Sequence, residues 1–207
     1  MDKTNVLLLV GGPQYHDNAE TREAILNLLS KKFDVTMTDD MAALNAENLA
    51  QIDVIVNFTT FIEPTQEQLQ ALLDAVAGGK GFVSIHGGTA TFWNSPEYIQ
   101  MVGGKFMVHD PNKMFRVNMS TSKYVEPHTI TEGVEDFDIQ DELYIIEGDL
   151  IQWHILARAE GHPILHTKMW GQGRVHNNAL GHDTRALNNP GFQALVLNGV
   201  EWAAGLR

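Results

Sequence analysis

The amino-acid sequence predicts an α/β fold: a doubly wound, mostly parallel β-sheet with helices on both faces, arranged in three layers. Continuous apolar runs closed by turns indicate strands buried on both sides, at residues 6–10, 53–57 and 81–85. Amphipathic helices are expected between them, at residues 20–32 and from residue 65 onward. Because strands and helices alternate, we expect parallel pairing through right-handed crossovers.

Each predicted helix carries local signals. Apolar side chains recur at helical spacing in residues 20–32, and lysines at the end favour the helix dipole. Thr65 and Gln68 have the spacing of a capping box, and the glycines at 78–79 end the helix that follows. The alternating residues 33–38 add a further strand.

The second half of the sequence is less regular. It predicts strands near residues 116–119, 141–147, 152–158, 164–169 and 174–180, and a closing helix at residues 190–204. The polar stretch 103–142 is expected to supply long functional loops. We find no repeat or linker, so the sequence predicts a single domain over residues 1–207.

Composition excludes several classes of function. With 14 basic and 26 acidic residues, the net charge of −12 disfavours nucleic acid and anionic membranes as partners. The chain has no cysteine, so any metal must be held by nitrogen and oxygen. No signal-peptide pattern or apolar stretch of membrane-spanning length is present, which predicts a cytoplasmic protein.

Two turns after predicted buried strands combine glycines with a histidine. His16 lies in the turn after the first strand, and His86 begins the turn after the fourth, followed by Gly87 and Gly88. Doubly wound sheets bind their ligands at the carboxyl ends of the strands. Glycines in the turns there let backbone N–H groups come close to a bound ligand. Neither turn has a nucleotide-binding fingerprint, so we expect no nucleotide cofactor. A lone histidine at a strand end is more often structural.

Further candidate residues gather in predicted turns or at strand ends, which favours a functional site: His109, His128, Asp141, Glu142, His182 and Asp183. Other histidines lie inside predicted strands or a Gly-His-Pro turn, where structural or surface roles are expected: His154, His162, His166 and His176. For the Asp141–Glu142 pair two interpretations stay open. Either one carboxylate orients a histidine or binds a metal while its neighbour points away, or both form a solvated acidic edge. Trp93, close after His86, is a candidate for stacking on a sugar ring.

These residues stand in ordered blocks that resemble the trehalose-utilisation (ThuA-like) family over nearly the whole chain. The blocks include residues 81–88, 98–106, 127–130, 141–144, 170–175, 179–183 and 199–203, together with His109. The resemblance implies the flavodoxin-like fold of class I glutamine amidotransferases. In those enzymes a cysteine nucleophile and an activating histidine occupy the positions that look like His86 and His182 here. Glutamine hydrolysis is therefore excluded, whereas an imidazole suits proton transfer or metal binding. One departure is His176, where an aromatic residue is more usual.

The resemblance further implies an enzyme of carbohydrate metabolism that acts on 3-keto-disaccharides or 3-keto-glycosides. A partner dehydrogenase would supply these sugars, and a histidine would remove the acidified C2 proton for elimination and hydration or for isomerisation. The implied catalytic residues are His86, His182 and Glu142. The implied substrate contacts are His16, Gly87, Gly88, Trp93 and Asp183. A divalent metal (zinc, manganese or iron) is implied at His86, His109, His128 and His182.

Two other functions stay open: a non-catalytic sugar-binding or regulatory domain, and a glycoside hydrolase. Retaining glycosidases need two facing carboxylates, for which adjacent Asp141 and Glu142 are poor candidates. A homo-oligomer is a further expectation without a motif behind it.

Overall fold

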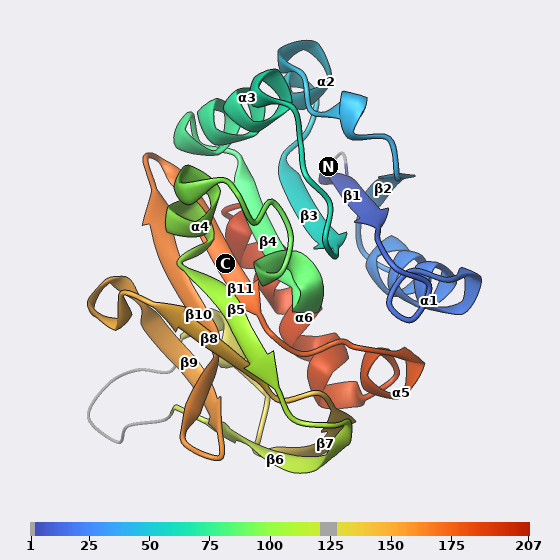
Figure 1. The fold of residues 1–207 in the computed structure, drawn as a ribbon, viewed down its shortest axis with the longest axis vertical. Coiled ribbons are helices and arrows are strands. Elements are labelled where there is room, and N and C mark those ends of the chain that lie inside the picture. Colours follow the sequence, from blue (N-terminus) through green and yellow to red (C-terminus); the bar gives the residue numbers. More distant parts are fainter. Residues whose placement is uncertain (1–2, 121–127) are drawn as a thin grey trace.

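The computed structural model describes residues 3–120 and 128–207, and within these ranges one nine-stranded sheet forms the centre of the molecule (Figure 1). Five neighbouring strands are parallel, in the order β2 (Asp34–Thr38), β1 (Asn5–Gly11), β3 (Val54–Thr59), β4 (Gly81–Ile85) and β11 (Gly173–Asn178). The sheet continues with antiparallel strands β10 (His162–Trp170), β9 (His154–Ala159), β6 (Lys113–Met119) and β7 (Phe137–Asp141). A separate two-stranded ribbon pairs β5 (Gly104–His109) with β8 (Tyr144–Gly148).

Helices cover both faces of the parallel strands because successive side chains of each strand point to opposite sides. On one face, Val6, Leu8 and Val10 of β1 share a core with the buried sides of α1 (Ala19–Ser30) and α6 (Pro190–Ala203). On the other face, Leu7 and Leu9 share a core with α2 (Ala46–Ala50), α3 (Gln66–Ala77) and α4 (Pro96–Val102). The predicted three-layer fold is confirmed.

Local signals account for the helix ends. Asn18 caps α1, and the predicted capping box of Thr65 and Gln68 is present at the start of α3. The short α5 (Thr184–Leu187) begins at its cap Asp183. Short 3₁₀ turns complete the chain: η1 (Met41–Ala43), η2 (His86–Thr89), η3 (Thr129–Thr131) and η4 (Leu150–Gln152). None of the helices in the described ranges is long and apolar enough to span a bilayer.

One sequence-based expectation in the second half is corrected, and another is refined. Residues 141–147 are not one strand, because β7 ends at Asp141 and β8 begins at Tyr144, which leaves Glu142 in a break between them. The stretch 103–142, expected to supply long functional loops, also contains β5 and β7 in addition to β6 at the strand predicted near 116–119; residues 121–127 lie outside the described ranges. Helices α2 and α4 were not predicted either.

Candidate functional site

The carboxyl ends of β1, β3, β4 and β11 bring distant segments together at one edge of the sheet. His16 follows β1, Thr60 follows β3, His86 follows β4 and His182 follows β11. Glu142 reaches the same place from the break between β7 and β8. In doubly wound sheets, ligand sites form outside the carboxyl ends where the strand order reverses, here around β1 and β3.

His86 sits on a tight turn that presents its ring to this edge. Its φ of 46° lies in the left-handed region, which is uncommon for a residue with a side chain. Its Nδ1 is 3.0 Å from the carbonyl oxygen of Ala179, so Nδ1–H donates and Nε2 carries the lone pair. Burial lowers the pKa of His86 to about 4, so the ring is neutral at pH 7. Nε2 is buried and has no hydrogen-bond partner among the described residues.

His16 and His182 face each other beside His86. His16 Nε2 is 2.9 Å from His182 Nδ1, and His16 Nδ1 is 2.9 Å from the hydroxyl of Thr60. Burial lowers the pKa of His182, but the hydrogen bond and charge of Glu142, with help from nearby aspartates, outweigh burial and raise it above its ordinary value. The charge on Glu142 thus favours a proton on His182.

Glu142 joins the three rings through one carboxylate oxygen. Its Oε2 lies 3.2 Å from His182 Nδ1, 3.6 Å from His86 Nε2 and 3.9 Å from His16 Nε2. Burial raises the pKa of Glu142, but its interactions with the three neighbouring histidine rings outweigh burial and hold the pKa far below its ordinary value. Glu142 is therefore a carboxylate at neutral pH.

Asp141 points the other way. Its fully buried carboxylate accepts hydrogen bonds from the backbone N–H groups of Gly181 (2.7 Å), His182 (3.0 Å) and Glu142 (2.9 Å). Burial raises the pKa of Asp141 to about 7, although these donors oppose the shift. Of the two interpretations of this acidic pair, the structure shows one carboxylate facing the histidines and the other directed at the backbone that positions His182.

His16, His86, Glu142 and His182, which we call the histidine–glutamate group, could hold a metal ion. Their donor atoms all lie within 4.8 Å of one another. Three imidazoles and a carboxylate suit zinc and similar divalent metals. Thr60 and the Ala179 carbonyl orient two of the rings through their second nitrogens, an arrangement typical of metal-binding histidines.

His109 lies at the rim of this group. Its Nδ1 is 3.6 Å from Glu142 Oε1 and 2.8 Å from the carbonyl oxygen of Asp110, and the side chain is 36% exposed. Its ring stacks against Tyr144, which itself packs on His86 with ring centroids 4.0 Å apart.

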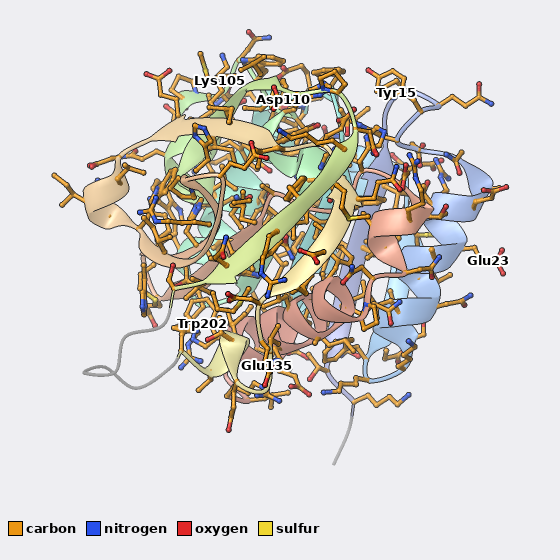
Figure 2. All side chains as sticks on the ribbon, turned by 90° about the horizontal axis from the view of Figure 1, so that it is seen from below. Tyr15, Glu23, Lys105, Asp110, Glu135 and Trp202 are labelled. Carbon is orange, nitrogen blue, oxygen red and sulfur yellow. The ribbon has the colours of Figure 1, made fainter. Side chains whose placement is uncertain are left out.

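The structure does not bring His128, a predicted metal ligand, to the group. His128 packs against Trp202 near the end of α6, with ring centroids 5.2 Å apart. The end of α6 lies against Gly81, the first residue of β4, whereas His86 follows the last. His128 is therefore at the opposite edge of the sheet, and Figure 2 shows Trp202 far from Tyr15, the neighbour of His16.

The predicted substrate contacts have diverse surroundings. Gly87 and Gly88 are buried, and a Cβ would come within 1.9 Å of Thr60 Oγ1 at Gly87 and within 2.4 Å of Ser84 Oγ at Gly88. Asp183 caps α5 and pairs with Arg185. Trp93 stacks on Phe61, with ring centroids 5.7 Å apart.

The histidines expected to be structural lie apart from the group. His166 and His176 are fully buried, with hydrogen-bonding contacts to the carbonyl oxygens of Val102 (3.0 Å) and His166 (3.1 Å), respectively. Burial lowers their pKa values to about 4 and about 3.

Sequence reasoning missed Thr60 and Tyr144 as parts of the site. A threonine directly after a buried strand was a usable signal for Thr60, because the turns after the two neighbouring strands carry His16 and His86. For Tyr144 the signals were its adjacency to the Asp141–Glu142 pair and its place in the family-like block 141–144.

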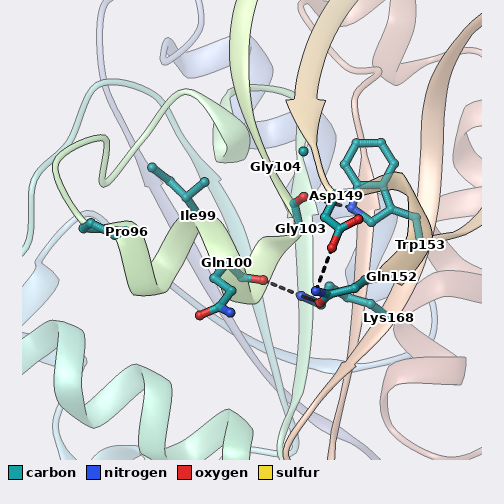
Figure 3. A pocket seen from close by; sticks show the side chains of 10 residues that line it. Pro96, Ile99, Gln100, Gly103, Gly104, Asp149, Gln152, Trp153 and Lys168 are labelled. Atoms are coloured by element: carbon teal, nitrogen blue, oxygen red, sulfur yellow. Dashed lines mark hydrogen bonds between the residues drawn. The ribbon is translucent and has the colours of Figure 1, made fainter.

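A surface pocket of about 320 Å³ opens elsewhere, at the end of α4 (Figure 3). Two side chains that line it, and His166 stacked on one of them, contact carbonyl oxygens at or just beyond the end of the helix: Lys168 with Gln100, Trp153 with Gly103 and His166 with Val102. Because these groups terminate the helix, the pocket is explained by capping of α4.

Fold and site together define a doubly wound α/β protein with a histidine–glutamate group at the strand ends. The chain belongs to the ThuA family, described as trehalose utilisation, whose model matches residues 5–203. No curated protein sequence matches it significantly.

Solved structures share the fold. A protein described as ThuA-like from Parabacteroides merdae has a TM-score of 0.86 and 20% identity, covering 100% of this chain and 91% of its own. A cytoplasmic protein from Salmonella typhimurium LT2 has a TM-score of 0.74 and 16% identity, covering 97% of this chain and 99% of its own. A β-galactosidase from Bacillus circulans has a TM-score of 0.63 and 12% identity, covering 98% of this chain but only 31% of its own.

Proposed function

We propose that this protein is a cytoplasmic, metal-assisted enzyme that removes the C2 proton of 3-keto-disaccharides or 3-keto-glycosides. The observation that supports this proposal most is the histidine–glutamate group, which combines three imidazoles with an ionised carboxylate. Family membership supports a carbohydrate substrate. A sugar dehydrogenase is the metabolic partner we propose, because it would supply the 3-keto sugar.

His16, His86, His182 and Glu142 would hold zinc, manganese or iron. The unpartnered, buried Nε2 of neutral His86 fits this role, because a buried polar atom without a partner destabilises the fold. A divalent metal there would supply positive charge beside the C3 oxygen, which favours the enolate.

We assign proton abstraction to His109. Its ring lies at the rim, more exposed than His182 and beside the carboxylate of Glu142. The C2 proton moves to the imidazole, and the C2–H electron pair forms the enolate. In elimination, that pair forms the C1–C2 double bond and expels the C1 substituent, which takes the proton from the imidazolium and leaves as an alcohol. In isomerisation, the enolate oxygen at C3 gains a proton, the C2 hydroxyl loses one to become the carbonyl, and the imidazolium delivers its proton to C3.

The glycoside-hydrolase alternative is less well supported. Both oxygens of Asp141 accept backbone hydrogen bonds, so Asp141 does not face Glu142 as a second catalytic carboxylate. Likeness to a β-galactosidase at 12% identity concerns the fold alone.

The first test is turnover. Purified protein, with and without chelator, is incubated with 3-keto-trehalose or a methyl 3-keto-glucoside in D₂O, and NMR follows deuterium at C2 and release of the C1 substituent. We expect both, with loss of activity in chelator. Unchanged substrate without exchange contradicts the enzyme proposal, binding without turnover favours a sugar-binding domain, and hydrolysis of unoxidised glycosides favours the hydrolase.

The second test separates ligands from the base. We expect His86→Ala and His182→Ala to lower metal affinity about 10–100-fold or more, measured by elemental analysis after dialysis against defined metal. His109→Ala should keep the metal and lose exchange by about 10²–10⁴-fold. Exposed His162→Ala is the matched control and should change neither. Full metal content in His86→Ala would remove His86 from the ligand set.

A further inference from the structure

We propose that the exposed face of Phe61, supported by Trp93, binds the sugar ring attached to the reacting ring of the substrate. This inference rests on the proposed function, because it assigns the second half of the same substrate to a surface beside the histidine–glutamate group.

Phe61 is connected to the group from two directions. It directly follows Thr60, whose hydroxyl is 2.9 Å from His16 Nδ1. In the other direction, a series of packed rings leads from Phe61 back to His86. Phe61 stacks on Trp93, with ring centroids 5.7 Å apart, and Trp93 packs edge-on against Phe106 at 6.3 Å. Phe106 in turn packs on Tyr144 at 4.3 Å, and Tyr144 packs on His86 at 4.0 Å. Phe61 is therefore joined to the histidine–glutamate group both through the chain and through this series of packed rings.

Two features of Phe61 act against stability. Its φ is 55°, a left-handed conformation that is strained in a residue other than glycine. Its large apolar ring is nevertheless 51% exposed. A role in binding accounts for both, because the strained backbone directs an aromatic face toward solvent.

Hydrogen bonds between two loops maintain this conformation. The N–H of Phe61 donates to the carbonyl of Ala90 (3.1 Å), and the N–H of Phe92 donates to the carbonyl of Ile62 (2.7 Å). The carboxylate of Glu63 accepts from the N–H of Trp93 at 2.8 Å. The loops after β3 and β4 are thereby joined, and the Phe61–Trp93 stack is preorganised.

The chemistry of the surface suits a pyranose. A sugar ring has an apolar C–H face that packs on aromatic rings, while its hydroxyl groups remain in water. The Nζ of Lys105 lies 4.8 Å from the Trp93 ring centroid and Phe61 stacks against the same indole, so Trp93 acts as the support. The contact predicted for Trp93 is therefore assigned to Phe61.

The test compares one sugar ring with two. Calorimetry measures binding of α,α-trehalose and of methyl α-D-glucopyranoside, which share the α linkage and are unoxidised. The wild type should bind trehalose up to about tenfold more tightly, as one aromatic contact allows. Phe61→Tyr should keep the preference. Phe61→Asn should lose it, because asparagine tolerates the left-handed backbone but lacks the ring.

Ile151→Ala, which truncates a 96% exposed apolar side chain, is the control and should bind like the wild type. The inference is overturned if the wild type binds the two sugars equally or not at all, or if Phe61→Asn keeps the preference. These sugars bind without reacting, so the result is independent of catalysis. A Phe61-dependent preference without turnover of 3-keto sugars would retain the subsite and remove only the proposed reaction.

Discussion

At the scale of single residues, Asp141 and Glu142 show how chain neighbours take different tasks. Because β7 ends between them, the carboxylate of Glu142 faces three histidines while that of Asp141 accepts three backbone N–H groups. Two of those groups belong to Gly181 and His182. Asp141 is therefore a positioning residue that connects the segment of Glu142 with that of His182.

Replacing this carboxylate by an amide tests the connection. In Asp141→Asn, the NH₂ group would face a backbone N–H, so at least one hydrogen bond is lost. We expect the free energy of unfolding to fall by about 1–3 kcal/mol, measured in urea. Zinc affinity should fall about 10–100-fold. Asp138→Asn, on the exposed side of the same strand, is the control. Wild-type zinc affinity in Asp141→Asn would contradict the positioning role.

At the scale of elements, the turn η2 fits against the end of β3 because it contains glycines. A Cβ on Gly87 would lie 1.9 Å from Thr60 Oγ1 and 2.9 Å from the carbonyl oxygen of Thr59. Position 87 therefore holds glycine because there is no room for a Cβ atom there. Close packing of η2 on β3 places His86 beside Thr60 and His16.

Adding one methyl group should disturb this packing. We expect Gly87→Ala to lower the free energy of unfolding by about 3 kcal/mol, the upper part of the range for overpacking, measured by chemical denaturation. In the control Gly133→Ala a Cβ meets nothing within 4 Å among residues 3–120 and 128–207, so only the strain at its positive φ remains, about 1–2 kcal/mol. Equal losses in the two variants would contradict the close approach of η2 to β3.

At the scale of the whole molecule, several neutral histidines lie in the interior. Burial lowers the pKa of His86 and His166 to about 4 and of His176 to about 3, from an ordinary value of 6.5. Between these values the unfolded chain binds protons that the folded chain does not. Their contribution to stability is therefore present above pH 6.5 and is lost as pH falls toward 4. The pKa of His182 is raised, so its contribution to stability depends on pH in the opposite direction. That contribution is present at low pH and is lost as pH rises.

The three buried rings should make the protein acid-labile. We expect the free energy of unfolding, measured in urea from pH 7.5 to 4.5, to fall steeply below pH 6.5, by up to about 1.4 kcal/mol per pH unit for each ring. His176→Leu removes one titrating group. The dependence of its free energy of unfolding on pH should therefore be shallower than that of the wild type, by up to about 1.4 kcal/mol per pH unit. Exposed His162→Ala should keep the wild-type slope. Identical slopes in His176→Leu and the wild type would contradict a buried, neutral His176.

The parallel half of the sheet was predictable because its signals are local. Apolar runs such as residues 54–56, the Thr65–Gln68 capping box and the glycines at 78–79 act within a few residues of themselves. The antiparallel half was not, because β10, β9, β6 and β7 pair in an order that depends on distant segments. The break in the chain at Glu142, between β7 and β8, could not be predicted for the same reason.

The sequence alone determined the α/β class, the family resemblance and the residues at strand ends, including His16, His86 and His182. Only the tertiary structure decided which of them meet: His16 and His182 come within 2.9 Å although 166 positions separate them. It placed His128 at the opposite edge and turned Glu142, not Asp141, toward the histidines. The physical reason is that local propensity acts over a few residues, whereas a site is made by strands that pair and loops that pack across the whole chain.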